Sequence, residues 1–81
     1  MYFTTTLLYR KVKNNIRYYK LSISLNLFGE YIFIREYGNV KYRKPTGLIH
    51  EYFPFSNEAL LKLEKIVKEK YKRGYSKNKS S

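Results

Sequence analysis

The chain of 81 residues contains no cysteine, no aspartate and a single histidine. Without cysteine it can form neither disulfides nor thiolate metal sites, and it has no thiol to serve as a nucleophile. A Ser-His-Asp triad cannot be assembled without aspartate. His50 alternates with Leu48 and Tyr52 along an expected strand, where a lone histidine is usually a packing or surface residue. These absences predict a protein that is not an enzyme and that uses no metal or cofactor.

Long apolar runs are missing too, and so is a glycine-rich phosphate loop of the Walker type. The longest unbroken apolar stretch, residues 31–34, is far too short to cross a membrane. Basic residues follow the first apolar residues instead of preceding them, which is the wrong order for a signal peptide. We therefore expect no membrane partner and a cytoplasmic location, where a reducing environment is compatible with the lack of cysteine.

Positive charge, in contrast, is abundant. Seventeen Lys and Arg face six Glu, which gives a formal net charge of +11. Such an excess attracts polyanions at long range. Nucleic acid is the first candidate partner, with an anionic membrane surface or an acidic protein behind it.

Residues 2–53 carry the patterns of a sheet. Apolar residues alternate with Lys and Ser over residues 19–25, which is the period of a half-buried strand. Residues 31–37 follow as a second strand that is apolar on both faces. Weaker patterns predict an edge strand at residues 2–12, a short strand at 40–43 and a last strand at 48–53. Polar residues, Gly and Pro predict turns or loops at residues 13–15, 26–29, 38–39 and 44–47.

A helix is predicted over residues 56–73. Ser56 is a suitable N-cap, Phe55 and Leu60 have the spacing of a hydrophobic staple, and Gly74 is a suitable residue just beyond the C-terminus. Apolar residues recur at steps of three and four, and the first three are expected to be buried on the sheet: Leu60, Leu63, Val67 and Tyr71.

The order of these elements predicts an α+β fold. One domain, residues 1–75, is expected to contain a four- to five-stranded antiparallel sheet followed by one C-terminal amphipathic helix packed on one face. Residues 76–81 are polar and basic, and they are predicted to form a disordered tail.

The strand at residues 31–37 interleaves aromatic and basic side chains. Strand alternation places four of them on one face: Tyr31, Phe33, Arg35 and Tyr37. Ile32 and Ile34 lie on the other face, and this aliphatic face is expected to meet the helix. The aromatic-basic face would then be partly open and suited to stacking on bases beside phosphates. The alternative is that these aromatic rings are packing residues.

The run "RYYKLSISLNLFGEYIFIREYGNV" resembles a WGR domain, above all the compact bacterial form. The family pattern of a basic residue with two aromatics corresponds to Arg17-Tyr18-Tyr19. "LFG" occurs at residues 27–29, and the family "REWGR" corresponds to "REYGN" at residues 35–39. The resemblance continues through "EAL" at residues 58–60 to "KYKRGY" at residues 70–75. It covers residues 14–75, most of the chain.

This resemblance implies a role in binding DNA. WGR domains occur in poly(ADP-ribose) polymerases, where they bind DNA at breaks, and in small bacterial proteins. The family tryptophan, which stacks near the DNA terminus, falls on Tyr37, and the family arginine falls on Asn39. Tyrosine can still stack, whereas asparagine cannot carry the arginine's charge. The residues that meet the phosphate backbone in the family fall on Asn14, Asn15 and Arg17. The polymerase activity belongs to a catalytic domain and is not implied.

The sequence therefore predicts a non-enzymatic module that binds duplex DNA or DNA ends without preference for base sequence. The alternatives are a protein-interaction module with an acidic partner and an RNA binder. The oligomeric state, and the loss of a contact at Asn39, stay open. The predicted nucleic-acid-binding residues are Asn14, Asn15, Arg17, Arg35, Tyr37, Gly38, Asn39, Lys41, Arg43, Lys44, Lys70 and Arg73.

Overall fold

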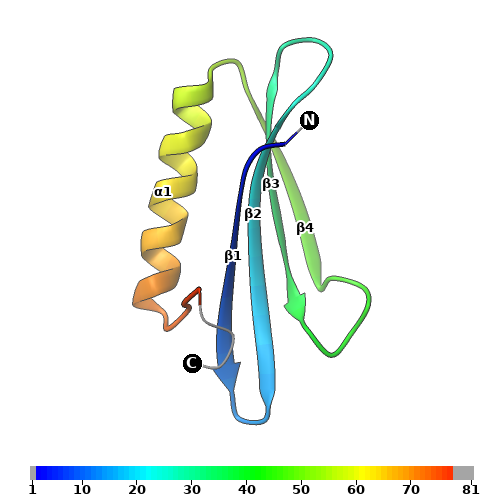
Figure 1. Ribbon diagram of the computed structural model, residues 1–81, viewed down its shortest axis with the longest axis vertical. Coiled ribbons are helices and arrows are strands. Elements are labelled where there is room, and N and C mark those ends of the chain that lie inside the picture. Colours follow the sequence, from blue (N-terminus) through cyan, green and yellow to red (C-terminus); the bar gives the residue numbers. More distant parts are fainter. Residues whose placement is uncertain (1, 78–81) are drawn as a thin grey trace.

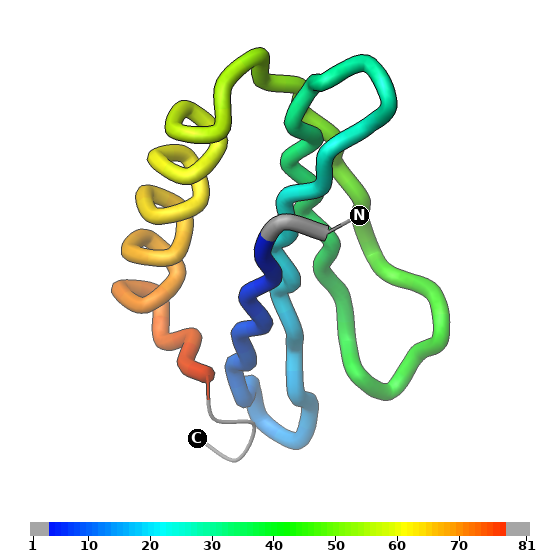
Figure 2. The backbone as a smooth tube through the Cα atoms, turned by 45° about the horizontal axis from the view of Figure 1, so that its top comes forward, coloured from blue at the N-terminus to red at the C-terminus, as the bar shows by residue number. Residues whose placement is uncertain are grey.

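A computed structural model of the chain describes residues 2–77, with side chains from residue 4 onward. Four strands precede one helix (Figure 1): β1 (Tyr2–Val12), β2 (Asn15–Leu25), β3 (Tyr31–Asn39), β4 (Gly47–Phe53) and α1 (Ser56–Lys72). The strands are neighbours in the order β1-β2-β3-β4, and each pair is antiparallel. The helix packs on one face of this sheet, as both views of the backbone show (Figure 2). These features confirm the predicted α+β fold with four strands.

Two of the turns follow directly from their residues. Lys13 and Asn14 connect β1 to β2, and Lys13 takes a left-handed conformation with φ of 58°. Between β2 and β3, the Asn26 Oδ1 accepts hydrogen bonds from the backbone N–H groups of Phe28 and Glu30, both at 2.9 Å. An asparagine side chain that bonds to nearby backbone in this way stabilises a turn. Both turns were predicted from the sequence and are confirmed.

The predicted strand at residues 40–43 is wrong. β3 continues through Gly38 and Asn39, which pair with residues of β2, and residues 40–46 form a loop between β3 and β4. Gly38 does not form a turn; its lack of a side chain allows neighbouring groups to pack closely against β3. A Cβ atom there would lie 3.0 Å from the Thr46 backbone nitrogen and 3.2 Å from Cε1 of Tyr18. The glycine therefore lets the returning loop and an aromatic ring pack against β3.

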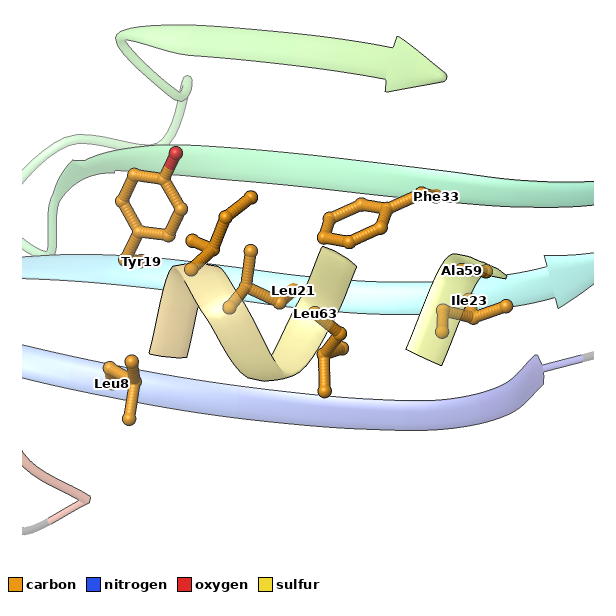
Figure 3. Close-up of a cluster of buried hydrophobic side chains, with 8 residues drawn as sticks. Leu8, Tyr19, Leu21, Ile23, Phe33, Ala59 and Leu63 are labelled. Carbon is orange, nitrogen blue, oxygen red and sulfur yellow. The ribbon is translucent and has the colours of Figure 1, made fainter. Parts of the chain in front are cut away.

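The core lies between the sheet and α1, on the side that we call the covered face (Figure 3). No other described element packs on the opposite side, the open face. Side chains from β1, β2, β3 and α1 meet in this core, and they exclude water from the middle of the sheet. The buried apolar residues are Leu8, Tyr19, Leu21, Ile23, Phe33, Ala59, Leu63 and Ile66.

The face expected to meet the helix was assigned wrongly. Phe33 is fully buried beneath α1, whereas Ile32 and Ile34 lie on the open face and are half-buried. β3 is apolar on both faces, so its own pattern cannot choose between them. The choice comes from β2, because register pairs Phe33 with Ile23 and so places it beside Leu21 on the face that β2 buries. The aromatic-basic face of β3 is therefore the covered face.

The buried stripe of α1 differs from the predicted one by a small rotation. Leu63 is buried as expected, but Leu60 and Val67 are only half-buried against the core, and Tyr71 is 44% exposed. Ala59 and Ile66 take the fully buried positions instead. Ala59 projects only a methyl group, which allows the helix to approach the sheet closely at that point.

The two ends of α1 are stabilised differently. Ser56 was predicted to be the N-cap, but it is the first helical residue. Phe55 holds the cap position and makes no side-chain cap hydrogen bond within residues 2–77. At the other end Gly74 has φ of 96°, as predicted for a residue just beyond the helix. Its N–H donates to the Tyr71 carbonyl at 3.1 Å, and the Tyr75 N–H donates to the Lys70 carbonyl at 3.0 Å. This pair of bonds is the Schellman motif.

The chain then returns to the sheet. Ser76 and Tyr9 exchange two backbone hydrogen bonds, of 2.7 and 2.8 Å. Ser76 was predicted to begin a disordered tail, but this bridge attaches it to the edge of β1. Lys77 follows as an exposed residue, and residues 78–81 of that predicted tail lie outside the described residues.

Candidate functional site

Positive charge is concentrated at one end of the molecule. Three segments meet there: residues 10–17 around the β1–β2 turn, the loop 40–46, and residues 70–77, which comprise the last turn of α1 and the chain that follows it (Figures 1 and 2). We call them together the hairpin end. They contain eleven Lys and Arg and no Glu, while the rest of the sequence contains six Lys and Arg and all six Glu. The entire net charge of +11 is therefore carried by the hairpin end.

Backbone contacts hold the three segments next to one another. The Val40 N–H donates to the Ile16 carbonyl at 3.0 Å, which ties the loop to β2. The bridge between Tyr9 and Ser76 ties the segment after the helix to β1. Like charges held close together repel and destabilise the folded state. A polyanion bound across the hairpin end would remove that repulsion.

The turn residues predicted to meet phosphates are placed together. Asn14 and Asn15 are exposed in and beside the β1–β2 turn, and Arg17 pairs in register with Asn39 across β2 and β3. The Asn39 Oδ1 accepts a hydrogen bond from the Lys41 backbone N–H at 2.9 Å. Asn39 therefore fixes the start of the basic loop, a role that its side chain can fill without any charge.

The other predicted cations fall into two groups. Lys41, Arg43 and Lys44 are exposed along the loop, and Gly38 is buried beneath it. Lys70 and Arg73 lie at the end of α1 and belong to the hairpin end.

Arg35 is placed differently from the rest of the predicted set. It lies further along β3 on the covered face, where it is half-buried, and its Nη2 donates to Glu51 Oε1 at 3.2 Å. This ion pair joins β3 to β4. The charge of Arg35 is thus already compensated within the fold.

Tyr37 is part of an aromatic cluster on the covered face. Its ring is parallel to that of Tyr19, with 5.5 Å between the centroids and 7° between the planes. Tyr75 meets the same Tyr19 ring edge-on, with 6.1 Å between the centroids. Gly47 lies so close to the Tyr37 ring that a Cβ atom there would overlap it. This environment favours the packing interpretation that the sequence left open, while the stacking of Tyr37 on a nucleic acid stays a prediction.

Lys70 caps this cluster. Its Nζ lies 4.1 Å from the centroid of the Tyr19 ring and 5.5 Å from that of Tyr75. These are distances at which a cation is attracted to an aromatic face. Partial burial lowers the pKa of Lys70, and the nearby charge of Arg73 lowers it further. Lys70 thus connects the aromatic cluster to the hairpin end.

Sequence reasoning missed two groups of residues. The first comprises five cations of the hairpin end that were not among the predicted binding residues, although Lys72 belongs to a basic cluster visible in the sequence: Arg10, Lys11, Lys13, Lys72 and Lys77. Their positions next to a predicted turn and a predicted helix end were the signal that could have found them.

The second missed group forms a groove of about 310 Å³ on the open face. The phenolic O–H of Tyr18 donates to Glu36 Oε2 at 3.0 Å along one wall. Burial and the adjacent Glu36 carboxylate raise the pKa of Tyr18. The groove lies beside the basic loop, and its walls include Leu7, Tyr9, Tyr18, Lys20, Glu36 and Tyr42.

Other kinds of site find no support within residues 2–77. No group of three or more His, Asp or Glu side chains is arranged to hold a metal ion there. No helix in that range has the length and apolar character needed to cross a membrane.

The comparisons with known proteins agree with the architecture. No curated protein and no solved structure matches the chain significantly. The model of the WGR domain matches residues 3–81, essentially the whole chain. The chain therefore belongs to the WGR domain family, which is known for binding nucleic acids.

Proposed function

We propose that the protein is a non-enzymatic module that binds duplex DNA or DNA ends through its hairpin end, without preference for base sequence. One observation carries the proposal, the confinement of the whole net charge to three adjoining segments. Lys and Arg side chains there neutralise phosphates and release condensed counterions, which provides most of the binding free energy. The polar turn of Asn14 and Asn15 adds hydrogen bonds to the backbone of the nucleic acid.

The lack of sequence preference follows from the kind of side chain presented. Contacts from Lys and Arg to phosphates position a protein on the duplex but carry no sequence information. Reading bases in the major groove requires a helix or a two-stranded ribbon inserted there. Here α1 packs along the sheet with its buried stripe against the core, and half of residues 10–17 around the β1–β2 turn are Lys or Arg.

The size of the hairpin end limits the number of contacts. The molecule measures 43 × 26 × 16 Å, and the hairpin end is one end of its longest axis. A surface 26 Å wide meets at most about seven phosphates along one strand, at 3.4 Å per nucleotide. We expect about four to be neutralised.

A salt-dependent titration tests the proposal. Labelled single-stranded DNA, duplex, nicked duplex and RNA are titrated with the protein at two salt concentrations, 50 and 200 mM. With about four phosphates neutralised, duplex affinity falls roughly a hundredfold between them. An affinity that does not depend on salt, or no binding of any DNA at the lower salt, contradicts the proposal and favours an acidic protein partner.

Matched variants locate the contacts. The test variant removes the three cations of the loop: K41Q, R43Q and K44Q. The control removes three cations of α1 outside the hairpin end: K62Q, K65Q and K68Q. The test variant lowers the slope of log affinity against log salt by about 2.7, or 0.9 per lost contact, and the control leaves it nearly unchanged. Equal losses in both variants would mean that the attraction comes from overall charge and not from this surface.

A further inference from the structure

The groove on the open face is not used by the proposed phosphate contacts, yet it adjoins them. Tyr42 belongs to the same loop as Lys41, Arg43 and Lys44, and it forms the wall of the groove nearest to these cations. A strand whose phosphates lie along this loop therefore passes the mouth of the groove.

Aromatic rings dominate the walls. Tyr9 and Tyr18 are opposite one another in the register of β1 and β2, and both side chains line the groove on the open face. Tyr18 is held in place by its hydrogen bond to Glu36 and packs close to Gly38, where an added Cβ atom would lie 3.2 Å from the ring. Tyr42 completes the set from the loop and is 65% exposed. Exposed rings beside a basic track are the usual means of holding unpaired bases.

The charges of the groove suit a base better than a phosphate. Lys20 and Glu36 are paired in register and line the same wall region. A carboxylate repels a phosphate, but it accepts hydrogen bonds from the amino group of a base, and an ammonium group donates to a ring nitrogen or carbonyl. The groove therefore has aromatic walls and polar atoms that match the edge of a base, while the three cations of the loop lie outside it.

We propose that this groove binds an unpaired base of the nucleic acid whose phosphates contact the loop, with Tyr42 stacking on that base. The inference rests on the proposed function and makes it more specific, because the favoured ligand becomes a duplex with a short single-stranded extension. This stacking position is on the open face, beside the basic loop, and is separate from Tyr37 on the covered face.

The test compares a blunt duplex with the same duplex carrying a short single-stranded overhang at either the 3′ or the 5′ end. We expect at least one overhang to bind about tenfold more tightly than the blunt duplex, as for one base stacked on an aromatic side chain. A 2-aminopurine base placed in that overhang loses fluorescence when it stacks on the protein.

Two variants make the test specific. Tyr42→Ala should abolish the preference for the overhang and the loss of fluorescence, while its affinity for the blunt duplex stays within about twofold and its salt slope is unchanged, because no phosphate contact is removed. Tyr52→Ala is the control. Tyr52 lies on the same face at the register position of Ile32 and is 58% exposed, but it is outside the groove. It should bind both ligands like the original protein.

The possible failures are distinguishable. If the blunt duplex binds but no overhang binds more tightly, the groove is not a base site and an apolar peptide becomes its better candidate. If Tyr42→Ala weakens both ligands equally, Tyr42 supports the loop and does not stack. If neither ligand binds at low salt, the proposed function itself is overturned together with this inference.

Discussion

The contact between Tyr37 and Gly47 gives a sharp test of the aromatic cluster. Tyr37 is half-buried, so truncation to Ala removes roughly half of the 3–5 kcal/mol that a fully buried aromatic ring contributes, or about 2 kcal/mol. Loss of the parallel stack on Tyr19 adds about 0.5–1 kcal/mol. A domain of this size loses about 4–8 °C in Tm per kcal/mol. Tyr37→Ala should therefore lower the Tm by about 10–20 °C.

Gly47→Ala probes the same contact from the other side. Gly47 does not have a positive φ, so its backbone tolerates a side chain. The added methyl would overlap the Tyr37 ring and force it from its stack, which costs about 1–3 kcal/mol. When Tyr37 is already Ala, the methyl enters vacated space and its cost should be close to zero. The two substitutions should thus be coupled by about 1–2 kcal/mol.

Urea unfolding of the two single variants and the double variant, followed by circular dichroism, measures this coupling. Tyr37→Phe is the control, because it keeps the ring in place and should remain within about 1 kcal/mol of the original protein. Additive costs, or an Ala variant that melts like the original protein, would refute the packing role. If the Ala variant is destabilised but its folded fraction binds duplex normally, Tyr37 contributes to stability and does not contact the nucleic acid. Tyr37→Trp should lose about 1–3 kcal/mol of stability, because the larger ring overpacks against Gly47.

Three further predictions concern single positions. Gly38→Ala places a Cβ atom 3.0 Å from the Thr46 nitrogen, so we expect a loss of about 1–3 kcal/mol in urea unfolding. An unchanged urea midpoint would show that the loop moves away from the added methyl group with no loss of stability. Asn26→Ala removes two accepted backbone hydrogen bonds and should lower stability by about 1–2 kcal/mol, and a variant with an unchanged urea midpoint would contradict this role. Because the pKa of Tyr18 is raised in the folded state, the unfolded chain ionises first, and stability falls as pH rises above about 10. Tyr18→Phe should show a shallower decline of the urea midpoint over that range, and an identical decline would contradict the assignment.

The fold was predictable mainly because β2 and α1 have clear periods in their own residues and recognisable turns separate the weaker strands. β2 alternates strictly, and α1 repeats apolar residues at helical spacing. Neither pattern could decide which face of β3 is covered, because Ile32 and Phe33 are both apolar. That choice depends on register with β2, which a single strand does not contain. The predicted set of buried residues on α1 was partly wrong for a similar reason. The burial of Ala59 depends on how the helix is rotated against the sheet, and the helical period of its apolar residues does not fix that rotation.

The hairpin end was only partly recognised, although its geometry follows from the order of elements. In an antiparallel meander, successive turns alternate between the two ends, so the β1–β2 turn and the β3–β4 loop must lie together. α1 begins at the opposite end, and its 17 residues span about 25 Å at 1.5 Å per residue. Nine residues of β3 span about 30 Å at 3.3 Å each, so the helix returns to the same end. The grooves and ring contacts, by contrast, depend on side-chain directions in space.

The distribution of charge explains how a small domain can carry so much of one sign. Outside the hairpin end the charges balance, and one pair there, Arg35 with Glu51, links two strands directly. The core and the middle of the sheet therefore form without a free-energy cost from repulsion between like charges. Repulsion is confined to the hairpin end, where every cation except Lys70 is exposed to water. Salt should then have opposite effects on the two states, because screening relieves this repulsion in the free protein and weakens the attraction for phosphates in the complex. The electrostatic free energy of the hairpin end is unfavourable in the free protein and favourable in a complex with a polyanion. This difference distinguishes a binding site from charge that is spread evenly over a protein.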